Sequence, residues 1–128
     1  MAYSVLVAED EPNIVLSLQF IMKKAGLDVR VAEDGDQAVR EMEKRTPDVV
    51  LLDIMLPKRD GFSVCETIKG NAEWSNVKVI MLTAKSRDED KQRAMELGAD
   101  DYITKPFSTR ELVDRVLELV GEKGPANA

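Results

Sequence analysis

Histidine is absent from the 128 residues of this sequence. Catalysis by a histidine acid or base, histidine ligation of a metal and an internal phosphohistidine are therefore excluded. Cysteine occurs once, as Cys65, so no intramolecular disulfide can form and a reducing compartment is expected. No apolar run approaches the roughly 20 residues of a membrane-spanning helix, and the N-terminal segment lacks the basic region of a secretory signal. We therefore expect a cytoplasmic protein without a membrane partner.

Basic residues are the minority among the charged ones. The sequence has 18 Lys and Arg against 24 Asp and Glu, which gives a formal net charge of −6. Because phosphate binding needs a basic surface, this chain is not expected to bind nucleic acid directly. Its length suits one compact domain. We expect that domain over residues 1–121, followed by a polar and disordered tail at 122–128, EKGPANA.

Short apolar segments alternate five times with amphipathic ones. The expected strands are 4–8, 28–32, 48–53, 77–83 and 101–104, and the expected helices are 12–25, 36–44, 62–69, 86–97 and 108–120. Several strands are apolar at nearly every position, which is typical of strands covered on both faces. The pattern predicts an α/β fold in which five helices cover both faces of a five-stranded, doubly wound parallel sheet.

Local signals mark the ends of several expected helices. Pro12 suits a first helical turn, and Gly26 is a stop signal after the same helix. Ser86 and Ser108 each precede a glutamate by three residues, which is the pattern of a capping box. We therefore expect these residues at helix ends.

Polar residues follow the expected strands at the point where each strand ends. In order of the strands, they are Glu9-Asp10-Glu11, Glu33-Asp34, Asp53, Thr83 and Lys105. Ligands bind beyond the carboxyl ends of parallel strands, and carboxylates are the ligands that Mg²⁺ prefers. A cation would keep neighbouring carboxylates ionised, while Lys105 adds positive charge and Thr83 a hydrogen-bond donor. We assign no chemistry to Glu33 and Asp34.

Asp53 stands inside VVLLDIML, residues 49–56, the most apolar stretch of the chain. Burial of a lone charge costs several kcal/mol. We therefore expect Asp53 to be unburied at the rim of the sheet, with its apolar neighbours forming the floor below. Taken alone, an aspartate at this position is equally compatible with a simple turn cap.

These residues resemble the motifs of bacterial response-regulator receiver domains, the CheY-like family. The resemblance covers residues 4 to about 120 and includes the pair Glu9-Asp10, DIMLPKRDG at 53–61, MLTA at 81–84 and Lys105-Pro106-Phe107. The segment DDYITKPF, residues 100–107, is typical of OmpR/PhoB-like regulators, which bind DNA through a separate domain.

The resemblance implies a two-component phosphoacceptor switch that is not an enzyme. Asp53 would accept a phosphoryl group from a phosphohistidine of a sensor histidine kinase or phosphotransfer protein and form an aspartyl phosphate. Mg²⁺ or Mn²⁺ would be bound by Asp10, Asp53, the backbone carbonyl of Met55 and, through water, Glu9. Thr83 and Lys105 would contact the phosphoryl oxygens. Such transfer relies on positioning and charge neutralisation.

The resemblance also implies a switch and an interaction surface. Movement of Thr83 onto the phosphoryl group would let Tyr102 rotate inward. A phosphorylation-dependent homodimer would use the fourth helix, fifth strand and fifth helix, through Lys91, Asp100, Asp101, Glu111 and Arg115. The expected pairs are Lys91 with Glu111 and Asp101 with Arg115; the basic partner of Asp100 would fall at position 122, which is a glutamate.

Three further features follow from the resemblance. The Lys105–Pro106 peptide is expected to be cis. Kinase docking would use the first helix, where Ile14, Val15 and Leu18 are either core or contact residues. Long side chains at Met55 or Lys85 could slow hydrolysis of the acyl phosphate.

Other readings of the sequence stay open at this stage. A flavodoxin-like FMN carrier shares the architecture but needs a glycine- or hydroxyl-rich phosphate cradle where this chain has Glu9-Asp10-Glu11. An aspartate-nucleophile phosphatase would carry a second acid where this chain has Met55. A receiver-like interaction module that works without phosphorylation is the nearest alternative. The chain is either a stand-alone receiver, which we favour, or a fragment of a longer regulator.

Overall fold

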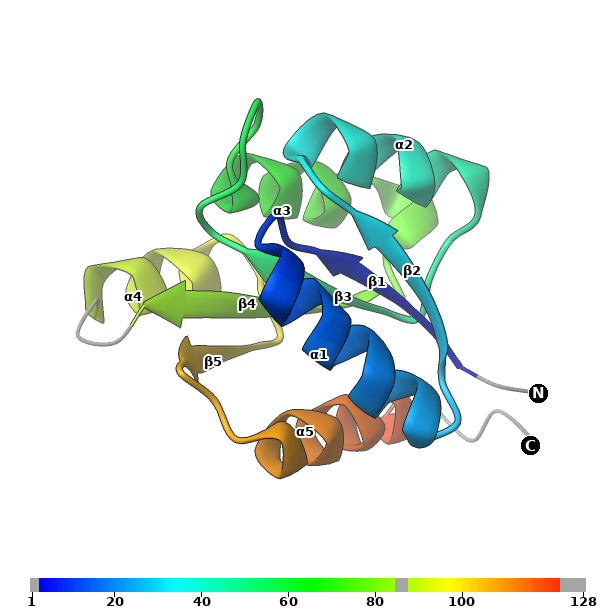
Figure 1. Cartoon of the computed structure of the whole chain (residues 1–128). Coiled ribbons are helices and arrows are strands. Elements are labelled where there is room, and N and C mark those ends of the chain that lie inside the picture. The colour runs from blue at the N-terminus through cyan, green and yellow to red at the C-terminus, as the bar shows by residue number, and fades with distance from the viewer. Residues whose placement is uncertain (1–2, 85–87, 123–128) are drawn as a thin grey trace.

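The computed structural model describes residues 3–84 and 88–122. Its strands are β1 (Ser4–Ala8), β2 (Asp28–Ala32), β3 (Val49–Asp53), β4 (Lys78–Ala84) and β5 (Asp101–Lys105). Its helices are α1 (Pro12–Lys24), α2 (Gly35–Lys44), α3 (Gly61–Lys69), α4 (Asp88–Glu96) and α5 (Thr109–Glu122), with a 3-10 helix η1 (Ala72–Trp74). All five strands form one parallel sheet in the order β2-β1-β3-β4-β5 (Figure 1).

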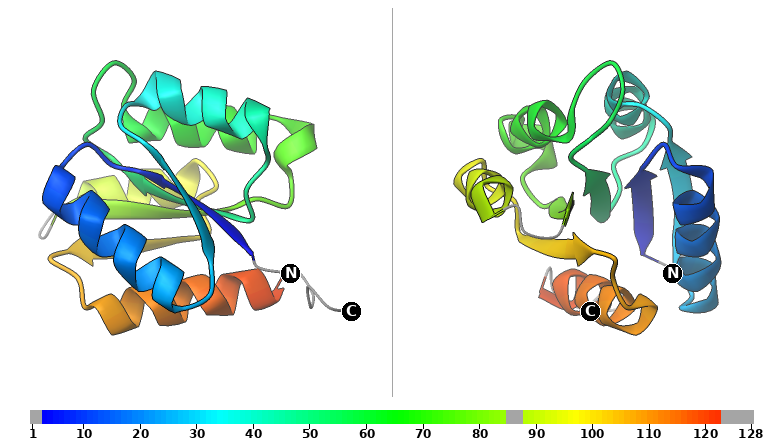
Figure 2. Two further views of the ribbon diagram at one scale, coloured as in Figure 1. Left: turned by 45° about the vertical axis from the view of Figure 1, so that its right-hand side comes forward. Right: turned by 60° about the vertical axis from the view of Figure 1, so that its left-hand side comes forward.

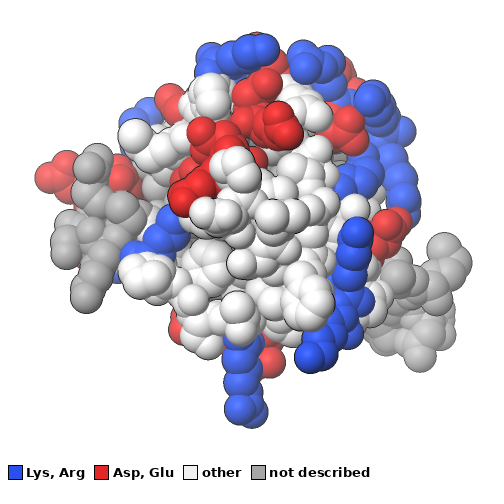
Figure 3. Space-filling view, viewed as in Figure 1, with Lys and Arg blue, Asp and Glu red and all other residues white. Residues whose placement is uncertain are grey.

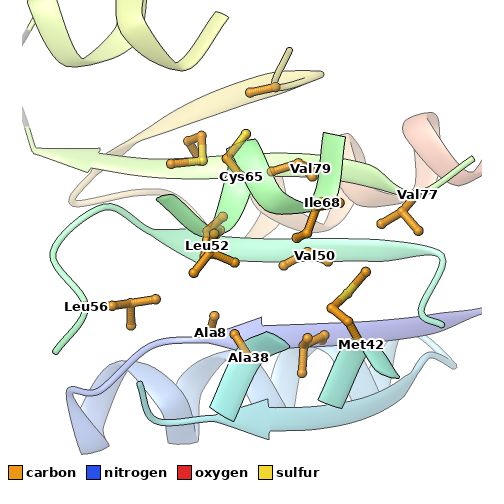
Figure 4. Close-up of a cluster of buried hydrophobic side chains, with 14 of the residues drawn as sticks. Ala8, Ala38, Met42, Val50, Leu52, Leu56, Cys65, Ile68, Val77 and Val79 are labelled. Atoms are coloured by element: carbon orange, nitrogen blue, oxygen red, sulfur yellow. The ribbon is translucent and has the colours of Figure 1, made fainter. Parts of the chain in front are cut away.

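Helices cover both faces of the sheet (Figure 2). On one face, alternate residues of the central strands, such as Val7 and Leu51, pack with Leu18 of α1 and Leu112 of α5. On the other face, the intervening residues pack against α2, α3 and α4, and Figure 4 shows part of this core. Each central strand thus buries side chains on both faces, which explains its continuous apolar sequence.

Cys65 belongs to α3 and lies in the core on the face of the sheet that α2, α3 and α4 cover. Burial raises the pKa of its thiol to about 11. The thiol is therefore protonated at neutral pH and behaves as a small apolar group.

The chain order of the strands reverses at the centre of the sheet. From β1 the chain first moves outward to β2, then crosses to β3 on the other side of β1. In the parallel register, Ala8 is opposite Leu52 and Asp53 is opposite Leu82. The residues after β1 and at the end of β3 are therefore neighbours where ligands bind in such sheets.

The predicted fold class is confirmed, and every expected element has bounds within two residues of the expected ones. Glu122, expected to begin the tail, belongs to α5, and η1 was not expected. The predicted cap at Ser86 and the rest of the tail lie outside the described residues. No helix in the described ranges is long and apolar enough to cross a membrane.

The predicted helix ends agree with the local backbone. Pro12 is in the first turn of α1, and Gly26 and Gly98 have positive φ angles of 87° and 97°. Glycine adopts such angles without the steric cost of a Cβ atom. Ser108 Oγ accepts a hydrogen bond of 3.3 Å from the Glu111 backbone N–H at the start of α5. The Lys105–Pro106 peptide is cis, as expected.

Candidate functional site

Three carboxylates meet at the carboxyl edge of the sheet. Ligand oxygens of Glu9, Asp10 and Asp53 lie within 4.8 Å of one another. They line a pocket of about 510 Å³, together with Lys105 and Met55. On the face seen in Figure 3, acidic side chains gather near the N-terminal end of α1, next to a broad uncharged surface. The structure thus brings together the ends of β1, β3 and β5.

Lys105 joins two of these carboxylates. Its Nζ atom is 2.7 Å from Glu9 Oε1 and 3.3 Å from Asp53 Oδ1. Burial of the ammonium group lowers its pKa, but the hydrogen bond to Glu9 and the charges of Asp53 and Glu9 outweigh that effect, so the pKa of Lys105 is raised. Lys105 therefore stays charged at neutral pH.

Glu9 is almost completely buried, with 1% of its surface exposed. Its Oε2 accepts hydrogen bonds from the backbone N–H groups of Asp10 and Glu11, at 3.0 and 3.2 Å. Its Oε1 accepts the bond from Lys105. Because both oxygens already have donors, Glu9 holds the turn after β1 and fixes the ammonium group. This arrangement favours an indirect rather than a direct contact with a metal.

Asp53 is buried, with 5% of its surface exposed, so the expectation of an unburied rim position is wrong. The chain after β3 folds back over the strand end, where Ile54 N–H donates to Leu82 O at 3.3 Å and Gly61 N–H donates to Ile54 O at 2.9 Å. The charge is compensated by Lys105 and by the Met55 N–H, which is 3.3 Å from Asp53 Oδ1. The sequence could not show this closure, because it depends on tertiary contacts.

The donor set fits a small divalent cation. Carboxylate oxygens are the hard ligands that Mg²⁺ prefers, with waters completing its octahedron. Asp10 is exposed to incoming ions while Asp53 forms the inner wall. Among the described residues that line the pocket, the acidic side chains outnumber the basic one, Lys105. This excess of negative charge would be neutralised by a divalent ion.

Thr83 is fully buried in β4, next to the residue opposite Asp53. Its Oγ1 has no hydrogen-bond partner among the described residues. Thr83 is not one of the residues that line the pocket. An unpaired buried hydroxyl carries a desolvation cost, which a new acceptor in the site would offset.

The other predicted residues lie on or near α4, β5 and α5. Tyr102 is half-buried, and Lys91 Nζ lies 5.4 Å from the centre of its ring. Arg115 forms an ion pair with Asp101 within the chain. Asp100 Oδ2 accepts hydrogen bonds of 2.7 Å from Lys69 Nζ and 2.8 Å from Val79 N–H, and Glu111 is exposed.

The predicted docking residues divide between core and surface. Leu18 is buried, while Ile14 and Val15 are half-buried. The Met55 side chain is 75% exposed at the mouth of the pocket. Lys85 lies outside the described residues.

Asp90 is a pocket residue that the sequence analysis did not single out. It lies in the first turn of α4 and lines the same pocket as Asp10 and Asp53. An acid in a first helical turn is explained equally well by the helix dipole, so its sequence position gave no distinct signal.

Comparison with known proteins gives one consistent result. A family model of the response regulator receiver domain matches residues 5–117. A protein of Chloroflexus aurantiacus described as a response regulator is 30% identical, with a TM-score of 0.91 over 94% of this chain and 99% of that one. The receiver domain of Francisella response regulator 1452 is 34% identical, with a TM-score of 0.87 over 94% and 98% of the two chains.

A third relative is the receiver domain of a histidine kinase from Syntrophus aciditrophicus. It is 33% identical, with a TM-score of 0.88 over 94% of this chain and 92% of that one. The chain therefore belongs to the response regulator receiver domain family of two-component signalling.

Proposed function

We propose that this domain is a Mg²⁺-dependent switch that is phosphorylated on Asp53 by a sensor histidine kinase or a phosphotransfer protein. The observation that carries the proposal is the position of Lys105, whose ammonium group bridges Glu9 and Asp53 while Asp10 lies on the exposed side of the same cluster. Such an arrangement holds an acceptor oxygen, a fixed positive charge and metal ligands at one point.

The chemistry is a phosphoryl transfer between two nucleophiles. An oxygen of the Asp53 carboxylate forms a bond to phosphorus as the P–N bond of the donor phosphohistidine breaks. The donor imidazole keeps the electron pair of that bond and takes up a proton. Lys105 is placed to neutralise charge on the transferred group, and the acceptor is a carboxylate oxygen rather than a hydroxyl, so no dedicated base on this chain is required.

Mg²⁺ would be held by Asp10, Asp53 and the Met55 carbonyl, with Glu9 behind a water, and would neutralise charge on the phosphoryl oxygens. Mn²⁺ has similar ligand preferences. The chain's own groups then orient the acceptor: the Met55 N–H and Lys105 both contact Asp53 Oδ1. The acceptor carboxylate is therefore fixed before the donor arrives.

The signal would leave the site through β4 and β5. Thr83 Oγ1 lacks a partner in the described residues, so an oxygen of the phosphoryl group would be its first strong acceptor. A shift of Thr83 would free space for Tyr102, whose ring contacts Lys91 on α4. The surface of α4, β5 and α5 would thereby change for a partner or for homodimerisation.

The homodimer can be tested through Arg115. In this structure Arg115 pairs with Asp101 of its own chain, so dimerisation would exchange that contact for one across the interface. We expect Arg115→Glu to abolish dimer formation by the phosphorylated protein in light scattering. Retained dimerisation would contradict the pairing.

Phosphorylation is tested with a small donor and intact-mass spectrometry. Incubation with acetyl phosphate and Mg²⁺ should add one phosphoryl group, and chelation of Mg²⁺ should prevent the gain. Asp53→Asn should gain none. A matched control is Asp114→Asn, which changes an exposed aspartate on α5 and should be phosphorylated like the wild type.

Two results would count against the proposal. Phosphorylation of Asp53→Asn at the wild-type level would show a different acceptor. No phosphorylation of the wild type by acetyl phosphate or by phosphohistidine donors would instead favour an interaction module that works without phosphorylation.

A further inference from the structure

The loop between β3 and α3, residues 54–60, packs against the N-terminal end of α2. We propose that Gly35, at the start of α2, is a positioning residue that holds this loop so that the Met55 carbonyl faces the metal. This inference rests on the proposed function, because the metal belongs to that function. It also accounts for Asp34, to which no chemistry could be assigned from its sequence position.

Backbone contact between Gly35 and the loop is very close. The Gly35 N–H donates a hydrogen bond of 3.2 Å to Pro57 O. A Cβ atom at residue 35 would lie 1.9 Å from the carbonyl oxygen of Arg59 and 2.6 Å from its Cβ. Because the obstructing oxygen belongs to the backbone, any side chain at position 35 must displace the loop itself.

The loop has a strained turn at this contact. Arg59 N–H donates to Pro57 O at 2.6 Å, which closes a three-residue turn around Lys58. Lys58 has a φ of 65°. Among the residues that the structure describes, no other non-glycine residue has a positive φ. Turns of this kind are rare and persist only when surrounding contacts hold them. The contact with Gly35 is such a restraint, since Pro57 O accepts both hydrogen bonds.

The position of Pro57 affects the Met55 carbonyl because Met55 has little freedom of its own: the backbone of Ile54 and the side chain of Leu56 are both held in place. Before it, Ile54 N–H is bonded to Leu82 O and Ile54 O accepts from Gly61 N–H. After it, the Leu56 side chain is buried in the core, with 7% of its surface exposed. The Met55 side chain is exposed and adds little restraint, so the direction of its carbonyl depends on these neighbours.

Asp34 strengthens the same contact. Its Oδ1 accepts a hydrogen bond of 2.7 Å from Gln37 N–H and so caps α2. Its Oδ2 lies 3.7 Å from the Nζ atom of Lys58, which is the central residue of the turn. The hydrogen bond from Gln37 holds the pKa of Asp34 below its ordinary value, so it is charged at neutral pH. Asp34 thus fixes the helix start on which the loop rests.

The test compares three glycine variants by calorimetric titration with Mg²⁺ alone. We expect Gly35→Ala to bind Mg²⁺ about 10- to 100-fold more weakly, as for other residues that orient metal ligands. Gly26→Ala places a side chain at positive φ with nothing within 4 Å, so it should lower the melting temperature without changing Mg²⁺ affinity. Gly121→Ala has equally open surroundings at ordinary φ and should change neither.

A second measurement serves if Gly35→Ala does not fold. In the wild type, hydrogen exchange of the Gly35 amide should be slow and become slower on addition of Mg²⁺, because loading the metal further restrains the loop. If folded Gly35→Ala bound Mg²⁺ with wild-type affinity, or if Mg²⁺ did not change the exchange rate of the Gly35 amide, the role of Gly35 would be contradicted. The proposed function would then still stand. A wild-type protein that binds no Mg²⁺ would overturn the proposed function as well.

Discussion

The two edges of the sheet use carboxylates in opposite ways. At the amino edge, Asp48 Oδ2 accepts a 2.7 Å hydrogen bond from Ser4 N–H, and Asp100 accepts from Lys69 and from Val79 N–H. At the carboxyl edge, the carboxylates of Glu9, Asp10 and Asp53 gather, and Lys105 contacts two of them, Glu9 and Asp53. The amino edge therefore ties strands together, whereas the carboxyl edge keeps an excess of negative charge.

The difference lies in how far the charge of each carboxylate is balanced by neighbouring groups. Asp100 connects α3, β4 and β5 through partners far away in sequence, and its charge is balanced within the chain. The cluster of Glu9, Asp10 and Asp53 is balanced only in part, which favours binding of a cation. Substitutions at the two edges should therefore separate folding stability from Mg²⁺ binding.

The largest effect is expected from Lys105→Met, because it leaves two buried carboxylates without their cation. The free energy of unfolding without Mg²⁺ should fall by about 3 kcal/mol, near the lower end for a broken buried pair, since Lys105 is partly exposed. Urea denaturation measures this loss. Saturating Mg²⁺ should restore part of it; a variant as stable as the wild type without Mg²⁺ would contradict the role of Lys105.

A smaller loss is expected at the amino edge. Asp100→Asn should reduce the free energy of unfolding by about 2 kcal/mol, because the hydrogen bonds from Lys69 and Val79 would then go to a neutral amide oxygen and the ion pair with Lys69 would be lost. Mg²⁺ affinity should stay at the wild-type value in calorimetric titration. A clear fall in Mg²⁺ affinity would show that the two edges are not independent.

Each edge also contains one buried hydroxyl without a partner among the described residues, Ser4 Oγ and Thr83 Oγ1. Ser4→Ala and Thr83→Val should each raise the free energy of unfolding by about 1 kcal/mol, because each removes an unpaired polar group. Chemical denaturation measures both.

Phosphorylation should separate these two variants. Treatment with acetyl phosphate and Mg²⁺ should change the NMR signals of the Tyr102 ring in the wild type and in Ser4→Ala. In Thr83→Val these signals should stay unchanged. An equal response in both variants would remove Thr83 from the switch.

The smallest effect concerns pH. Because the folded pKa of Lys105 is raised above its ordinary value of 10.5, its contribution is fully present below that value and is lost as pH rises through the folded pKa. The difference in unfolding free energy between wild type and Lys105→Met should therefore be constant near neutral pH and shrink above about pH 10.5. Shrinkage already near neutrality would contradict the raised pKa.

Local sequence signals predicted the framework of the fold. Helix ends and strands could be predicted from Pro12, Gly26 and the apolar runs of the central strands, because these signals depend only on residues nearby in the sequence. The alternation of strands and helices then places Asp10, Asp53 and Lys105 at one edge of the sheet.

The burial of Asp53 could not be predicted from the sequence, because it depends on the close approach of Gly61 to the Asp53 carbonyl. A Cβ at Gly61 would lie 2.3 Å from Asp53 O, a contact that no local pattern shows. The role of Asp100 was likewise hidden, since Lys69 is 31 residues away.

Mg²⁺-dependent stability tests the central difference between the two edges most directly. The melting temperature of the wild type and of Asp100→Asn should rise with Mg²⁺ concentration, as for any ligand that binds only the folded state. Asp10→Asn, which removes the exposed metal ligand and some charge repulsion, should melt no lower than the wild type without Mg²⁺ and respond little to it. An equal rise in Asp10→Asn and the wild type would contradict the assignment of the carboxyl edge as the metal site.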